Sequence, residues 1–206
     1  MNRKRAAALG VSIIIICVTA FTVWNLLTSI PDALPEGQNP ELMLPLYDYS
    51  HLDVIQAYGQ IRPDYFHPGF DFGVNDTTVI VAPCDAYVTY INSWYNDKSG
   101  HWQTNVGLRL NSKWRIDIVF ESWAENETYG ALQFQAIIVR VGQFVAANQT
   151  IGNLLCHGSY AHIHFGLYFN EEAVCPYPYF TPSAQSTFQE LYMKVGQPAG
   201  DWCIIP

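Results

Sequence analysis

From about residue 53 onward, hydrophobic and polar residues alternate in short runs, which is the pattern of β-strands with one buried face. Asn111 and Ser112 form a typical turn between two of these runs. The predicted strands cover residues 79–82, 86–91, 105–110, 114–120, 136–141 and 161–168, with a further short strand between Gly142 and Gly152. Many short strands predict an all-β domain built mainly from antiparallel sheets.

A convincing helical pattern occurs near the C-terminus. Phe188, Leu191, Tyr192 and Val195 recur at spacings of three or four residues, so that a helix over 186–195 would have one apolar face. We therefore expect one short C-terminal helix beside the sheets.

The N-terminal pattern is different, because residues 6–29 carry no charge and include four consecutive isoleucines at 13–16. A helix of this length would be about 36 Å long, which is enough to cross a membrane. We expect an uncleaved transmembrane signal anchor; the alternative is a cleaved signal peptide, whose apolar core usually has only about 7–15 residues. The basic residues within 1–5 place the N-terminus in the cytoplasm and the rest of the chain outside the cell membrane.

Residues 30–50 contain four prolines and a polar stretch at 36–39. This composition predicts a semi-extended spacer between the membrane and a single domain over residues 51–206.

The charge distribution limits the partners of that domain. Arg3, Lys4 and Arg5 precede every acidic residue, and the remainder of the chain has seven basic residues against 18 acidic ones. Nucleic acids and anionic lipid headgroups are therefore poor partners, since both need clustered lysine and arginine.

Four cysteines lie in the predicted external domain, namely Cys84, Cys156, Cys175 and Cys203. Their spacing does not resemble a zinc knuckle, and an even number outside the membrane permits two disulfides in three connectivities. A bond between Cys175 and Cys203 would hold the C-terminal tail against the sheets.

Two short motifs carry metal-binding chemistry. His162 and His164 are two residues apart on a predicted strand, so their side chains leave the same face. His67 and Asp71 are four residues apart across a bend. Either motif alone is a frequent accident, but together, in a chain with six histidines, they predict a zinc site with one position left for water.

These motifs resemble the H-x-x-x-D and H-x-H signatures of the lysostaphin/LytM-type zinc endopeptidases. Other segments resemble the same family in the same order, over about residues 53–168. They are the segments at 58–62 (YGQIR), 67–71 (HPGFD), 81–88 (VAPCDAYV), 141–152 and 161–165 (AHIHF).

The resemblance implies one zinc ion per chain, bound by His67, Asp71 and His164. It also implies that His162 lies beside the metal without binding it and acts as the general base. The expected activity is hydrolysis of peptide bonds in peptidoglycan, at a cross-bridge or a stem peptide, by an enzyme anchored in the cell membrane.

One position departs from the family pattern. The family carries a further histidine in a "Y.H" strand motif, where the segment at 118–123 places Ser122 or, after a one-residue slip, Glu121. A serine is a weaker donor to an oxyanion, an ionised glutamate would repel it, and loss of one such donor typically costs about a hundred- to thousandfold in rate. The alternative function is therefore an impaired relative that retains zinc and binds the wall or regulates a hydrolase.

The remaining histidines have weaker claims. His157 is close in sequence to the H-x-H motif and lies in a predicted loop, so it is an accessory candidate for the vacated position; the alternative is a solvated loop residue. His51 and His101 are outside any motif, and we expect both at the surface.

Overall fold

A computed structural model describes residues 30–204 of the chain. The predicted cytoplasmic tail and transmembrane anchor, residues 1–29, lie outside the described residues. Within residues 30–204, no helix is both long enough and apolar enough to span a bilayer. Everything described from Asp32 onward belongs to one structural unit.

Most of this unit consists of short strands and the turns between them. The strands are β1 (Leu52–Gln56), β2 (Tyr58–Arg62), β3 (Tyr65–His67), β4 (Phe70–Val74), β5 (Thr78–Val81), β6 (Ala86–Asn96), β7 (His101–Arg109), β8 (Trp114–Ala124), β9 (Phe144–Val145), β10 (Thr150–Leu154), β11 (His162–Phe169), β12 (Glu172–Val174) and β13 (Cys203–Ile204). The helices are α2 (Glu127–Gln135), the 3-10 helix η1 (Tyr177–Tyr179) and α3 (Pro182–Lys194).

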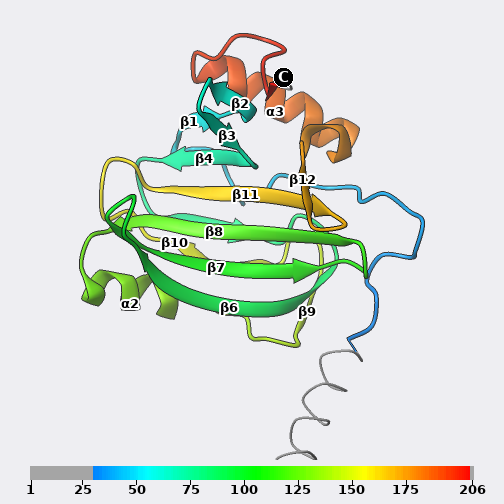
Figure 1. The fold of residues 1–206 in the computed structure, drawn as a ribbon, viewed down its shortest axis with the longest axis horizontal. Helices are drawn as coiled ribbons and strands as arrows, with labels where there is room; N and C mark the ends of the chain where they lie inside the picture. The colour runs from blue at the N-terminus through cyan, green and yellow to red at the C-terminus, as the bar shows by residue number, and fades with distance from the viewer. Residues whose placement is uncertain (1–29, 205–206) are drawn as a thin grey trace, which may run out of the picture. The chain divides into compact units, whose positions relative to one another are not determined.

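The largest sheet has the strand order β1-β4-β11-β8-β7-β6-β9, and β12 also pairs with β11. Figure 1 shows the central strands of this sheet one below another, with α3 above β4 and α2 below β8. Two smaller sheets, β10-β5 and β13-β2-β3, complete the unit, and all strand pairs except β13 with β2 are antiparallel. The predicted all-β, mainly antiparallel class is confirmed.

The two faces of the large sheet differ in character. On β11, Ile163, Phe165 and Leu167 are fully buried, whereas His162 and His164 alternate with them and lie on the opposite face. Burial of the apolar face therefore fixes the register of β11, and the two histidines lie on its polar face.

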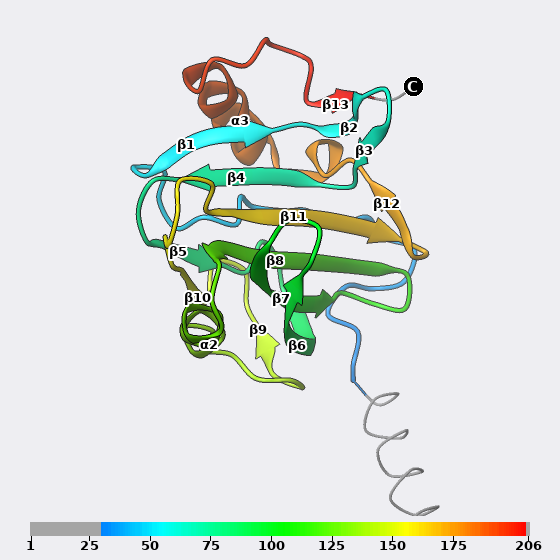
Figure 2. The same ribbon diagram turned by 60° about the vertical axis from the view of Figure 1, so that its left-hand side comes forward.

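Helix α3 covers the β4 end of the large sheet in both ribbon views (Figure 2). The ring centroid of its Phe188 lies 4.8 Å from that of Phe70 on β4, within a cluster of aromatic rings. The helix begins four residues before the predicted start, because Thr181 caps its first turn and Pro182 occupies the first helical position. The predicted C-terminal helix is thus confirmed.

Helix α2 was not predicted, because it has no apolar stripe. Its buried residues are Gly130 and Gln133, while Tyr129, Leu132 and Phe134 are exposed. Asn126 caps the helix by accepting a hydrogen bond from the Tyr129 N–H.

The predicted strand at 136–141 is wrong. Ile137 makes one isolated bridge to Gly152, and Ile138 and Val141 are exposed. A β-branched run needs a neighbouring strand and a face to bury, and this segment has neither over most of its length.

The segment predicted as a spacer packs onto the domain. Leu42, Leu44 and Leu46 are buried, and the Val81 N–H donates to the carbonyl of Pro45. The three leucines share one face because they are two residues apart in an extended chain. The domain therefore begins before residue 51.

A disulfide joins Cys175 to Cys203, as suggested for the C-terminal tail, and links the segment before η1 to β13. Cys84 and Cys156 are free, so one of the two permitted disulfides is formed.

The packing of this N-terminal segment can be tested by truncating one leucine. Leu42→Ala should lower the free energy of unfolding by about 2–5 kcal/mol, because a fully buried side chain is replaced by a cavity. The neighbouring Met43, which is 39% exposed, provides the control, and Met43→Ala should cost less than about 0.5 kcal/mol. Urea denaturation measures both values, and equal losses would contradict the packing described.

Candidate metal centre

Three side chains converge where β3, β4 and β11 meet. Asp71 and His164 are direct partners in the β4–β11 ladder, and His67 ends β3 just before β4 begins. The Nε2 atom of His67 lies 3.0 Å from Asp71 Oδ1 and 3.0 Å from His164 Nδ1, and His164 Nδ1 lies 2.9 Å from the same oxygen. The predicted ligand residues are thus together, with one possible ligand atom each facing a common point.

This arrangement fits a zinc ion. The ligand atoms of a tetrahedral zinc ion are roughly 3.3 Å apart, so the observed separations need to widen by only a few tenths of an ångström. The Nδ1 atom of His67 lies 2.6 Å from the carbonyl oxygen of Ala57 and donates to it, which leaves the Nε2 lone pair facing the ligand group. Gly69 is also required, since a Cβ atom there would lie 2.8 Å from the His164 ring.

The electrostatics of the group favour a cation. Burial raises the pKa of Asp71, but hydrogen bonds to His164 and His67 lower it by more, so that the pKa lies below its usual range. Burial lowers the pKa of His67, and the hydrogen bond and charge of Asp71 outweigh this and raise it. Asp71 is therefore an ionised carboxylate at neutral pH, able to accept either protons from its neighbours or a metal ion.

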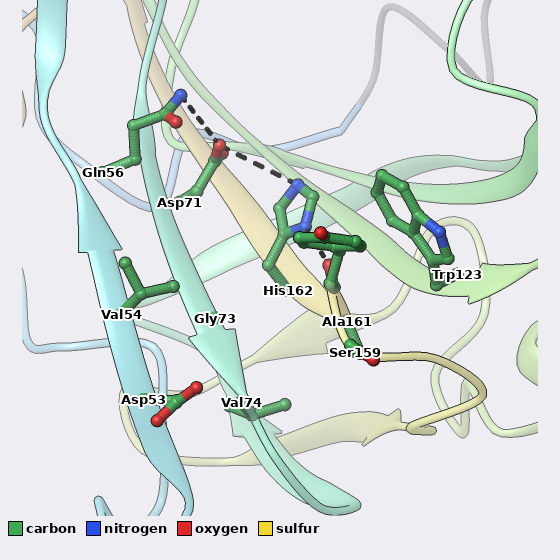
Figure 3. Close-up of a pocket in the computed structure, with 11 residues that line it drawn as sticks. Asp53, Val54, Gln56, Asp71, Gly73, Val74, Trp123, Ser159, Ala161 and His162 are labelled. Carbon is green, nitrogen blue, oxygen red and sulfur yellow. Dashed lines mark hydrogen bonds and ion pairs between the residues drawn. The ribbon is translucent and has the colours of Figure 1, made fainter.

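His162 lies beside this group and outside it. Its Nδ1 atom donates to the carbonyl of Tyr160 at 2.7 Å. Its Nε2 atom is 3.8 Å from Asp71 Oδ2 (Figure 3) and 3.5 Å from Glu121 Oε1. Burial lowers the pKa of His162, but the two carboxylates more than offset this and raise the pKa to about 9.

A cleft of about 250 Å³ adjoins the group through Asp71 and His162. Figure 3 shows Gln56 reaching the Asp71 carboxylate from β1, with Trp123 beyond His162 on the other side. The cleft is lined by Asp53, Val54, Gln56, Asp71, Gly73, Val74, Trp123, Ser159, Tyr160, Ala161 and His162. A concave surface of this kind, next to a potential metal site, is where a substrate would bind.

The structure decides between the two candidates for the family's additional histidine. Glu121 pairs directly with His162 across the β8–β11 ladder and shares its face. Ser122 points the other way, is fully buried, and its hydroxyl has no hydrogen-bond partner in the described part of the chain. Of the two residues named from the sequence, Glu121 is therefore the one on the face of His162, and Ser122 is not.

The accessory candidate His157 is placed elsewhere. Its ring lies flat against Tyr129 of α2, with centroids 4.4 Å apart and an interplanar angle of 11°. Its backbone N–H donates to the carbonyl of Ser122. These contacts hold His157 against α2. Glu121, and not His157, is the residue that lies beside His162.

His101 was expected at the surface, and this expectation is wrong. The residue is 1% exposed, its Nε2 atom lies 2.8 Å from Glu121 Oε2, and its ring stacks on Trp123. The sequence signal was available but incomplete, because the predicted strand began at 105 whereas β7 begins at His101. An earlier start would have placed His101 and Gln103 together on one face of that strand.

No protein-family model matches the chain, and no curated protein matches it. Among solved structures, Csd3 from Helicobacter pylori matches with a TM-score of 0.48 and 20% identity, over 76% of this chain and 39% of that one. The catalytic domain of the prophage-encoded M23 protein EnpA from Enterococcus faecalis, solved as a point mutant, matches with a TM-score of 0.46 and 19% identity. The match covers 65% of this chain and 95% of that one.

The catalytic domain of the antimicrobial peptidase lysostaphin from Staphylococcus simulans matches with a TM-score of 0.40 and 19% identity, over 68% of this chain and 91% of that one. The chain therefore spans less than half of the Csd3 structure and most of the two catalytic domains. The similar structures include the lysostaphin type of peptidase that the sequence motifs resemble.

Metal analysis tests the ligand group directly. After dialysis against metal-free buffer and titration with zinc, the chain should bind one zinc ion, measured by mass spectrometry of the metal. His164→Ala should weaken binding by at least about tenfold, because a first-row metal site depends on each of its few ligands. Asp64→Asn changes an exposed carboxylate near the site in sequence and should bind zinc normally. An unchanged zinc affinity of His164→Ala would contradict the assignment of His164 as a ligand.

A second test uses the acid stability of the metal-free chain. Burial raises the pKa of Glu121, but hydrogen bonds to His101 and His162 lower it further, to about 2 from 4.5. A depressed pKa contributes stability that is present above about pH 4.5 and is lost as the pH falls toward 2, here about 3 kcal/mol.

The difference in stability between the wild type and Glu121→Gln should accordingly shrink between pH 5.5 and pH 3, as measured by urea denaturation. Glu172→Gln, which changes an exposed glutamate at the start of β12, serves as the control substitution. A Glu121→Gln difference that is independent of pH would show that this carboxylate is not held ionised by its neighbours.

Proposed function

We propose that the chain is a membrane-anchored zinc metalloendopeptidase that hydrolyses peptide bonds of a cell-wall polymer, at a peptidoglycan cross-bridge or stem peptide. The observation that carries this proposal is the convergence of His67, Asp71 and His164, with His162 beside them and a cleft alongside. The motif resemblance supports the substrate class. The uncharged segment at 6–29 supports the anchor, which would keep the domain where such a polymer is found.

His67, Asp71 and His164 would hold the zinc ion in this proposal. A bound zinc ion supplies a Lewis acid that polarises a carbonyl group and lowers the pKa of water. The protein contributes the orientation of two of these ligands, through the Ala57 carbonyl behind His67 and the space that Gly69 leaves for the His164 ring.

His162 would move the proton in this reaction. Its Nδ1 atom is occupied by the Tyr160 carbonyl, so Nε2 is the atom that can take a proton from an attacking water and return it to the leaving amine. The carboxylates of Asp71 and Glu121 raise the pKa of His162 and so favour its holding of a proton. If Asp71 bound a cation, its charge would act less on His162, which would favour the neutral imidazole that a general base needs.

The second candidate function is an impaired relative that retains the metal and binds wall polymer or a partner hydrolase without cutting. The observation that favours it is the position of Glu121. An ionised carboxylate on the site face, where the family carries an imidazole, cannot donate to a developing oxyanion.

Cleavage assays separate the two candidates. The zinc-loaded chain should release new amino termini from glycine-bridged peptides or from whole peptidoglycan, as followed by mass spectrometry. His162→Ala should lower kcat by about a hundredfold or more and leave zinc binding intact, since general acid–base catalysis contributes about that factor. His51→Ala, at the turn before β1, is the histidine control.

Each other outcome has a definite meaning. Zinc binding without cleavage of any wall peptide would favour the impaired relative. Cleavage that survives His162→Ala would contradict the role given to that imidazole.

A further inference from the structure

Glu121 is held from both sides of its carboxylate. Its Oε2 atom accepts a hydrogen bond from Gln103 Nε2 at 2.6 Å and lies 2.8 Å from His101 Nε2, which donates to it. Its other oxygen, Oε1, faces His162 Nε2 at 3.5 Å. Two donors on one oxygen fix the plane of the carboxylate and so determine where the second oxygen points.

An irregularity of the backbone makes this arrangement possible. Trp102 pairs with Ala124 and Thr104 with Phe120, so an advance of two residues along β7 corresponds to four residues along β8. The extra residues of β8 form a bulge that contains Glu121 and lies beside His101 and Gln103. Bulges of this kind re-aim side chains next to functional sites.

Trp123 closes the bulge in a strained conformation. Its φ angle is 59°, in the left-handed region that bulky residues rarely adopt. In this conformation the ring stacks on His101, with centroids 4.1 Å apart, and lies 6.3 Å from the ring of His162. Strain that persists beside a site indicates that the surrounding contacts over-determine the geometry.

Burying His101 costs desolvation free energy that an apolar residue with only a packing role would not cost. Its side chain is 1% exposed, and both of its ring nitrogens face polar atoms, with Nδ1 3.3 Å from the carbonyl of Ser99. Burying an imidazole and a carboxylate side by side gains little stability over well-packed apolar residues. The pair does, however, fix one carboxylate oxygen relative to His162.

We propose that His101 is a positioning residue for His162 and that it acts through Glu121. His101 and Gln103 hold Oε2, and Oε1 then keeps the His162 imidazole turned toward Asp71 and the ligand group. Glu121 is on this account part of the support of His162 and not a failed replacement for an oxyanion donor. The effect on catalysis rests on the proposed function, whereas the coupling between the two rings does not.

The first experiment measures the coupling without any substrate. The zinc-loaded full chain is labelled with 15N-histidine, and the ring signals are compared between the wild type and His101→Phe, which keeps an aromatic ring against Trp123 and removes the donor. The ring signals of His162 should shift, while those of His67 and His164 and the zinc content should not. His51→Phe is the matched control and should leave all of these signals in place.

Glu121→Asp provides a second variant that is milder than a ring replacement. It retains the charge but shortens the side chain by one methylene, which withdraws the carboxylate from His162, so the His162 signals should shift again. Unchanged His162 signals in both variants would overturn the proposal.

The second experiment measures catalysis. His101→Phe should lower kcat by about ten- to a hundredfold with KM changed less than twofold, because a misplaced base affects the reacting geometry more than binding. His101→Gln restores a donor and should recover much of the loss. An active enzyme in which His101→Phe leaves kcat unchanged overturns the proposal even if the signals shift. If the wild type cleaves no wall peptide, the proposed function fails, and the ring signals alone decide the positioning role.

Discussion

The register of β11 between β4 and β8 is the constraint on which the site depends. It places His164 opposite Asp71 on one side and His162 opposite Glu121 on the other. A slip of one residue would turn both histidines into the core and bring Ile163 to the polar face. The buried apolar residues of β11 prevent that slip, so the hydrophobic face of the strand holds the chemistry of the other face in place.

Two carboxylates organise the polar face that this register creates. Asp71 lies within hydrogen-bond distance of His67 and His164, and Glu121 accepts from His101 and Gln103. His162 lies between the two carboxylates, within 4 Å of each. In a partly buried setting such a network is stable only when every member has a partner, which makes its geometry unusually well defined. A metal ion at Asp71 would complete one half of the network and leave the other half to orient His162.

The second half of the network also changes how Glu121 is understood. From the sequence, a glutamate in this strand counts against catalysis, because it replaces a donor with an acceptor. In the structure the same carboxylate is occupied on one oxygen by His101 and Gln103 and faces His162 with the other. In the proposed function, the place of Glu121 beside His162 would distinguish an enzyme with altered support from an impaired relative.

The sequence by itself determined the strands with clear alternation, the C-terminal helix and the four residues His67, Asp71, His162 and His164, because these signals are local or lie in short motifs. Only the tertiary structure decided that Glu121 and not Ser122 faces the site, and that His101 is buried beside it. Both outcomes depend on where the bulge between β7 and β8 falls. The position of a bulge is set by the pairing of distant strands, and alternation within one strand carries no information about its neighbour.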